Sequence, residues 1–73
     1  MRITGEQVFP VNTKQFAISP STEGYTLNYS ADGVGWTAYE DAVPAGEVCI
    51  VNFGVPGMSY KLVGNVGDVF IQY

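Results

Sequence analysis

The clearest structural pattern in this sequence is YTLNYSADGVGWTAY, residues 25–39. Tyr25, Leu27 and Tyr29 alternate with polar residues, which is the period of a strand with one buried face. Asp32-Gly33 then marks a tight turn, because glycine accepts positive φ and aspartate tolerates it. This stretch is therefore predicted to be a β-hairpin. It holds the only Trp and three of the five Tyr, so we expect the core to be built on it.

Shorter runs of strand-forming residues lie on both sides of this hairpin. Nine Gly and four Pro separate them at a spacing of roughly 8–12 residues, which is typical of antiparallel sandwiches and barrels. No helical period is sustained over a window of about 11 residues free of Gly and Pro. The predicted fold is all-β, a small antiparallel β-sandwich or barrel of about five to seven short strands. The strands outside the hairpin are expected at 8–11, 15–18, 48–53, 59–63 and 69–73.

The sequence also predicts the position of one strand in its sheet and the turn between the last two strands. The run 48–53, VCIVNF, is the most apolar and is rich in β-branched residues, so it is predicted to be a central strand. Gly64-Asn65 is a hairpin signal between the last two strands, although Gly67-Asp68 competes with it as the turn.

The first 24 residues have two possible arrangements. Pro10 lacks an N–H and restricts strand 8–11 to an edge or a bulge, and residues 19–24, SPSTEG, form a loop. The segment 1–24 is either an extended arm that is ordered against a neighbouring subunit or an ordinary edge strand and loop. In both cases residues 1–73 form a single domain.

The chain is short and has no covalent means of stabilisation. A domain of 73 residues buries only about 60% of its unfolded surface, which leaves roughly 3–5 kcal/mol of net stability. Cys49 is the only cysteine, so no intrachain disulfide forms, and the lack of His removes the usual zinc ligands. Yet 47% of the residues are apolar and only 14% are charged. Part of the surface is therefore expected to be an interface in a homo-oligomer.

The alternation along each strand divides the apolar side chains between core and interface. The expected core residues are Tyr25, Leu27, Tyr29, Trp36, Ile50, Leu62, Val69 and Ile71. The expected interface residues are Phe9, Phe16, Tyr39, Phe70 and Tyr73. The face of Phe70 depends on the strand register, because a slip of one residue would exchange it with Ile71.

The charge balance disfavours two classes of partner. The formal net charge is −4, and the three cations, Arg2, Lys14 and Lys61, are scattered. Nucleic-acid binders need clustered Lys and Arg, and anionic membranes attract basic surfaces, so neither nucleic acid nor membrane is an expected partner. Residues 1–6 turn polar before an apolar segment develops, so no secretory signal is expected and the chain should be made in a cytoplasm.

Catalytic chemistry has little support in this sequence. Ser or Cys nucleophiles normally need His as a base, and the chain has none. Lys61 is expected on a solvated strand face, and Cys49 is expected to act as a small apolar residue. The acidic residues Asp32, Glu40, Asp41 and Asp68 lie in predicted turns, where they favour local hydrogen bonds. We expect no enzyme activity, cofactor, metal or small-molecule substrate.

Several short motifs resemble a known class of viral protein. They are YSADG at 29–33, WT at 36–37, VPAGE at 43–47 and YKLVGN at 60–65. Together they resemble small β-rich virion modules of tailed bacteriophages, in which similar hairpins and a Pro-Ala-Gly turn occur in one domain. These modules include head-decoration, auxiliary capsid and head-fibre proteins. The resemblance spans residues 25–73.

This resemblance implies a structural virion protein that decorates or stabilises a capsid or forms part of a head fibre. It further implies symmetric copies, often trimers, that contact other virion proteins and bind no cofactor. The hairpin motif also looks like part of discoidin-type sugar-binding modules. The alternative is thus a small carbohydrate-binding β-sandwich in which Asp32, Trp36 and Tyr39 face solvent. A third interpretation is an adaptor that binds one specific protein partner, such as an enzyme or a toxin.

Overall fold

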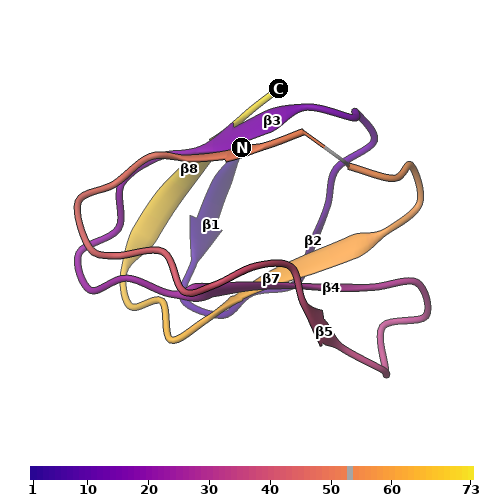
Figure 1. Ribbon diagram of the computed structural model, residues 1–73, viewed down its shortest axis with the longest axis horizontal. Helices are drawn as coiled ribbons and strands as arrows, with labels where there is room; N and C mark the ends of the chain where they lie inside the picture. Colours follow the sequence, from indigo (N-terminus) through magenta and orange to yellow (C-terminus); the bar gives the residue numbers. More distant parts are fainter. Residues whose placement is uncertain (53) are drawn as a thin grey trace.

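The computed structural model describes residues 1–52 and 54–73 and has two antiparallel four-stranded sheets (Figure 1). Sheet I has the strand order β1-β8-β3-β6, and sheet II has the order β2-β7-β4-β5. Figure 1 shows β3 and β8 in one layer and β4 and β7 in the other. The predicted all-β, sandwich-like fold is confirmed. The strands are β1 (Arg2–Thr4), β2 (Phe9–Pro10), β3 (Phe16–Ile18), β4 (Thr26–Ser30), β5 (Thr37–Ala38), β6 (Cys49–Val51), β7 (Ser59–Val63) and β8 (Asp68–Gln72).

The described residues thus form eight strands, against about five to seven expected. The additional strand is β1, which lies in a segment without a recognisable period. Ile3 is its one inward-facing residue and is fully buried, while Arg2 and Thr4 are exposed. A strand of three residues contains too few positions for alternation to be detected in the sequence.

The predicted hairpin at 25–39 is confirmed, with a longer loop than expected. Strands β4 and β5 pair antiparallel, with Tyr29 opposite Thr37 and Asn28 opposite Ala38. Residues 31–36 form the loop, and Gly33 within it has a φ of 78°, which L-residues with side chains rarely adopt. The Asp32-Gly33 signal therefore marked a turn within a longer connection.

The core lies between the two sheets and is formed by alternate residues of each strand. On sheet II, Leu27 lies opposite Leu62 and Tyr29 lies opposite Tyr60, so their side chains share the inner face. Phe9 stacks on the Tyr60 ring at a centroid distance of 5.8 Å, and Phe16 meets the same ring edge-on at 5.1 Å. Tyr60 is thus the centre of an aromatic cluster that joins both sheets.

Five of the eight expected core residues are buried, namely Tyr25, Leu27, Leu62, Val69 and Ile71. Tyr29 is partly buried against this core. The other two expectations were wrong. Ile50 is 58% exposed because it lies on the outer face of β6, and Trp36 is only partly buried at the end of the hairpin loop. The Lys61 Nζ covers the Trp36 ring at 4.4 Å from its centroid.

The expectation of a central strand at 48–53 was also wrong, because β6 forms the edge of sheet I and, among the described residues, pairs with β3 alone. Phe53, the last residue of that predicted strand, lies outside the described residues. Both faces of an apolar run look alike in sequence, so such a run does not distinguish a central strand from an edge strand with an exposed apolar face.

The expected hairpin at Gly64-Asn65 is replaced by a connection between the sheets. Strand β7 belongs to sheet II and β8 to sheet I, so residues 64–67 cross from one sheet to the other. Asn65 is buried in this connection, and its Nδ2 donates to the Gly5 carbonyl at 2.8 Å. The turn signal was present, but turn residues do not specify which sheet the next strand joins.

The first 24 residues are an integral part of the sandwich. Strands β1 and β3 pair with β8 in sheet I, and β2 pairs with β7 in sheet II. Strand β2 is an edge strand, as Pro10 required. This segment contributes five buried apolar side chains, which are Ile3, Phe9, Val11, Phe16 and Ile18. Of the two arrangements considered, the structure has the edge strand and loop within the domain.

Candidate protein-interaction site

The outer face of sheet I exposes a group of apolar side chains, which we call the outer apolar face: Ala17, Val48, Ile50 and Phe70. Ile50 lies directly opposite Ala17 on the neighbouring strand. The exposed fractions of Val48, Ile50 and Phe70 are 56%, 58% and 57%. A shallow depression of about 220 Å³ lies among Ala17, Val48, Phe70 and the nearby Pro20. Contiguous exposed apolar groups of this kind mark protein-interaction sites more often than isolated ones.

Backbone hydrogen bonds hold the centre of this face in a fixed position. The Ser19 N–H donates to the Phe70 carbonyl at 2.9 Å, and the Phe70 N–H donates to Ser19 Oγ at 2.8 Å. Phe70 therefore protrudes from a strand that is bonded on both sides, to β3 and to β1. A partner would meet a preformed surface, with little backbone ordering to lower its affinity.

The five expected interface residues lie in three different environments. Phe70 and Tyr73 are exposed, at 57% and 67%. Phe9 and Phe16 are 1% and 3% exposed, so their placement at an interface is corrected to the core. The two rings lie on the inner faces of β2 and β3, where both pack against the buried Tyr60 ring and are removed from water.

Tyr39, the fifth, lines a small aromatic pocket of about 250 Å³ with Tyr29, Val55, Met58 and Tyr60. The Tyr29 and Tyr39 rings meet edge to face, with centroids 6.5 Å apart. Burial, followed by the neighbouring Glu40 carboxylate, raises the pKa of Tyr39. Tyr39 thus belongs to the rim of the core.

Asp32 and Trp36, proposed for the sugar-binding alternative, contribute to the local structure of the hairpin. Asp32 Oδ1 accepts hydrogen bonds from Val34 N–H at 2.9 Å and Gly35 N–H at 3.0 Å. The Ser30 hydroxyl donates to the same oxygen at 2.9 Å. The Gly35 and Val34 N–H groups, then Ser30, lower the pKa of Asp32 to about 2. This carboxylate organises its own loop, and the Trp36 ring is in contact with Lys61.

Metal and nucleophile chemistry was also considered. Within residues 1–52 and 54–73, no group of three or more Cys, Asp or Glu is arranged to hold a metal ion. Cys49 is partly buried against the core, and burial raises the pKa of its thiol, which leaves it protonated at neutral pH. Burial also raises the pKa of the adjacent Tyr25 phenol. In the same residues there is no helix long and apolar enough to cross a membrane.

Val48 and Ile50 are the residues of the outer apolar face that sequence reasoning missed. In a strand, Val48 and Ile50 share one face, and Cys49 and Val51 share the other. Val51 is buried, so Val48 and Ile50 face outward. Because all four are apolar, the sequence does not reveal which pair faces inward.

These features define the protein as a small all-β sandwich with an exposed apolar sheet face. No family model matches the chain, and no curated protein or solved structure matches it.

Proposed function

We propose that this protein is a structural subunit that works by packing its outer apolar face against other protein surfaces, first of all against copies of itself. The observation that carries the proposal is the exposure of Val48, Ile50 and Phe70 on one rigid sheet face. Burial of apolar area contributes roughly 25 cal/mol per Å², so a small domain gains stability when such a face is covered. The proposal includes no catalytic step, cofactor or nucleic acid.

We further propose that the assembly is a bacteriophage particle, in which the subunit decorates or stabilises the capsid or forms part of a head fibre. The support for this setting is the resemblance of the motifs at 29–33, 43–47 and 60–65. Trimeric packing follows from the same resemblance. The expected location is the virion, after synthesis in the host cytoplasm. Recovery of the protein in particles purified by density gradient tests this setting, and its absence from them would contradict it.

The self-association is tested by light scattering of the purified protein from 1 to 100 μM, a range set by the micromolar affinity of about 8 kcal/mol that a modest interface provides. The wild-type mass should be a multiple of the 7.9 kDa chain. Phe70→Ser should reduce that mass to the monomer without changing the far-UV spectrum, because the side chain is 57% exposed and lies outside the core cluster.

The matched control is Val66→Ser, a comparable apolar side chain, 53% exposed, in the connection between β7 and β8. It should leave the mass unchanged. A wild-type protein that stays monomeric over the whole range would contradict self-association through this face.

A further inference from the structure

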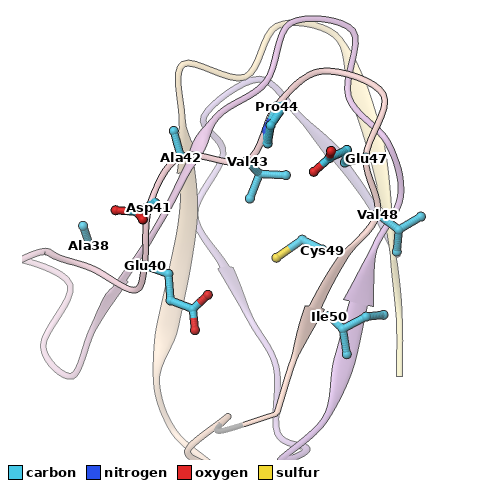
Figure 2. Close-up of a pocket in the computed structure, with 10 residues that line it drawn as sticks. All are labelled: Ala38, Glu40, Asp41, Ala42, Val43, Pro44, Glu47, Val48, Cys49 and Ile50. Carbon is cyan, nitrogen blue, oxygen red and sulfur yellow. The ribbon is translucent and has the colours of Figure 1, made fainter.

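An open groove runs along the free edge of β6, on the side away from β3. We call it the edge groove. Its volume is about 590 Å³, within the range of about 300–1,000 Å³ that is usual for ligand-binding clefts. One wall is the edge of sheet I, and the other is the segment 38–44 that leaves β5 of sheet II (Figure 2). The lining residues are Ala38, Glu40, Asp41, Ala42, Val43, Pro44, Glu47, Val48, Cys49 and Ile50.

The backbone of Ile50 faces this groove with its hydrogen-bonding groups unused. The Ser19 N–H points to β8, where it donates to the Phe70 carbonyl. Because backbone groups alternate in direction along a strand, the N–H and C=O of the neighbouring Ile18 point to β6. Ile18 lies opposite Cys49, so the backbone groups of Cys49 are the ones that bond to β3. The N–H and C=O of the next residue, Ile50, therefore point away from β3. No hydrogen bond outside the strand ladders involves Ile50 in the part of the chain that the structure describes.

The groove is apolar at its floor and acidic at its walls. Figure 2 shows Val43 and Cys49 pointing into it together with the carboxylates of Glu40 and Glu47. The Asp41 carboxylate points away from the centre, and no Lys or Arg occurs among the described lining residues. An occupant with positive charge would therefore be attracted from several sides.

We infer that the edge groove binds an extended, basic segment of another protein, which adds to sheet I as a strand beside β6. Unpaired strand edges are templates for this mode of recognition, in which main-chain hydrogen bonds give affinity and alternate side chains give specificity. Lys or Arg at every second position would reach Glu40 and Glu47. The apolar residues between them would extend the outer apolar face beside Ile50.

The chemistry of the chain disfavours a second copy as the occupant. Its own cations are Arg2, Lys14 and Lys61, and no described strand contains two of them. The N-terminal segment is part of both sheets and is not free to be donated. This inference goes beyond the proposed self-association, since it concerns the edge of sheet I instead of its outer face.

The test is an NMR titration of the ¹⁵N-labelled protein with the acetylated and amidated peptide Lys-Val-Lys-Val-Lys at low salt. Saturable shifts are expected at the amides of residues 40–44 and 48–51, with slowed hydrogen exchange at Ile50. Glu40→Gln and Glu47→Gln should each weaken binding by about 1.5- to 5-fold, as expected for exposed ion pairs. Glu23→Gln, an exposed carboxylate outside the groove, should leave it unchanged.

Two further measurements separate strand addition from simple charge attraction. The same peptide with every interior amide nitrogen methylated keeps its charge but cannot pair with β6, so its affinity should fall at least tenfold. Ile50→Pro should have the same effect on the unmodified peptide. Ile50→Thr keeps the N–H and loses only apolar contact beside the peptide, so it should weaken binding clearly less than Ile50→Pro.

The inference is overturned if the methylated peptide binds equally well, or if the shifts spread over all the acidic residues. It is also overturned if the amides of residues 40–44, which line the groove but are not part of the outer apolar face, shift on concentration of the protein alone, because that would assign the groove to a second copy. None of these results depends on the mass measured by light scattering, so the two proposals fail separately.

Discussion

The two sides of the sandwich are held together in different ways. On the β1/β2 side, two connections that cross between the sheets are bonded to each other. The Gly5 N–H donates to the Gly67 carbonyl at 2.8 Å, the Gly64 N–H donates to Glu6 Oε2 at 2.7 Å, and Asn65 Nδ2 donates to the Gly5 carbonyl at 2.8 Å. These bonds join residues about 60 positions apart, so they tie the ends of the chain into one unit.

On the β5/β6 side, the corresponding bonds join residues only 18–25 positions apart, and a groove opens along the edge of β6. The segment 38–47 is fixed by the Tyr25–Val43 bridge, whose two hydrogen bonds are 3.0 and 2.7 Å, and by Gly46 N–H to the Ser21 carbonyl. The difference indicates a division of roles. The β1/β2 side, which we call the tied side, stabilises the fold. The β5/β6 side, which we call the open side, leaves backbone and apolar groups available for contacts.

The largest expected effect compares one residue from each side. Phe9→Ala on β2 should cost about 3–5 kcal/mol, because it removes a ring that is 1% exposed and stacks on Tyr60. That cost equals the whole net stability expected of so small a domain, so the cooperative unfolding transition should be lost or shifted far below that of wild type. Ile50→Ala on β6 should change the free energy of unfolding by about 0.5 kcal/mol or less, since the side chain is largely exposed.

Urea unfolding at low micromolar concentration, followed by Trp36 fluorescence, measures both variants. Dilute protein is used because self-association would add stability through Ile50. If Phe9→Ala unfolds at nearly the wild-type urea concentration, β2 is dispensable and the tied side does not stabilise the fold.

A smaller effect is expected at the connection between β7 and β8. Asn65 is 5% exposed, and besides Gly5 its Nδ2 reaches the Gly67 carbonyl at 3.4 Å. Its Oδ1 has no hydrogen-bond partner among the described residues, which lowers the net contribution of the side chain. Asn65→Ala should therefore destabilise the fold by about 1–2 kcal/mol, mainly by leaving the Gly5 carbonyl unpaired.

The control for this prediction is Asn12→Ala, at an exposed asparagine with no hydrogen bond in the described structure. Thermal unfolding should separate the two variants clearly. Equal midpoints would mean that the backbone bond between Gly5 and Gly67 holds the connection without the Asn65 side chain.

The sequence predicted the strands more reliably than their places in the sheets. Alternation identified β7 and the inward face of β4, because Thr26 and Asn28 flank Leu27, and Lys61 separates Tyr60 from Leu62. It failed for β6, where both faces are apolar. It also failed for the partner of β8, since strand pairing is a long-range property that local turn signals do not encode.

The interaction surface was only partly predictable for the same reason. Phe70 is exposed and its neighbours Val69 and Ile71 are buried, but the run Val69-Phe70-Ile71 is apolar throughout, so the sequence did not fix its register. Phe9 and Phe16 lie in strands of two and three residues, where a single aromatic residue gives no face information. The edge groove depends on which strands end each sheet, so it becomes visible only in three dimensions.

The smallest expected effect concerns the hairpin loop on the open side, where the stabilising contacts are local. The pKa of Asp32 is lowered to about 2 in the folded protein from an ordinary value of 3.8, chiefly by the N–H groups of Gly35 and Val34. A lowered pKa means that the ionised carboxylate stabilises the fold above pH 4 and that this contribution is lost as the pH falls toward 2. Asp32→Asn should thus be less stable than wild type at pH 6, and the difference should shrink between pH 4 and pH 2.

Urea midpoints of wild type and Asp32→Asn at pH 6, 4, 3 and 2 measure this convergence. Asp41→Asn provides the matched control, because the Asp41 carboxylate accepts no hydrogen bond from the described residues and the substitution removes none. A constant difference between wild type and Asp32→Asn at every pH would show that the asparagine disturbs the loop by its shape instead of its charge. In that case packing, and not the charge of Asp32, would stabilise the hairpin loop on the open side. The difference in stabilisation between the open side and the tied side would then be smaller than the hydrogen bonds indicate.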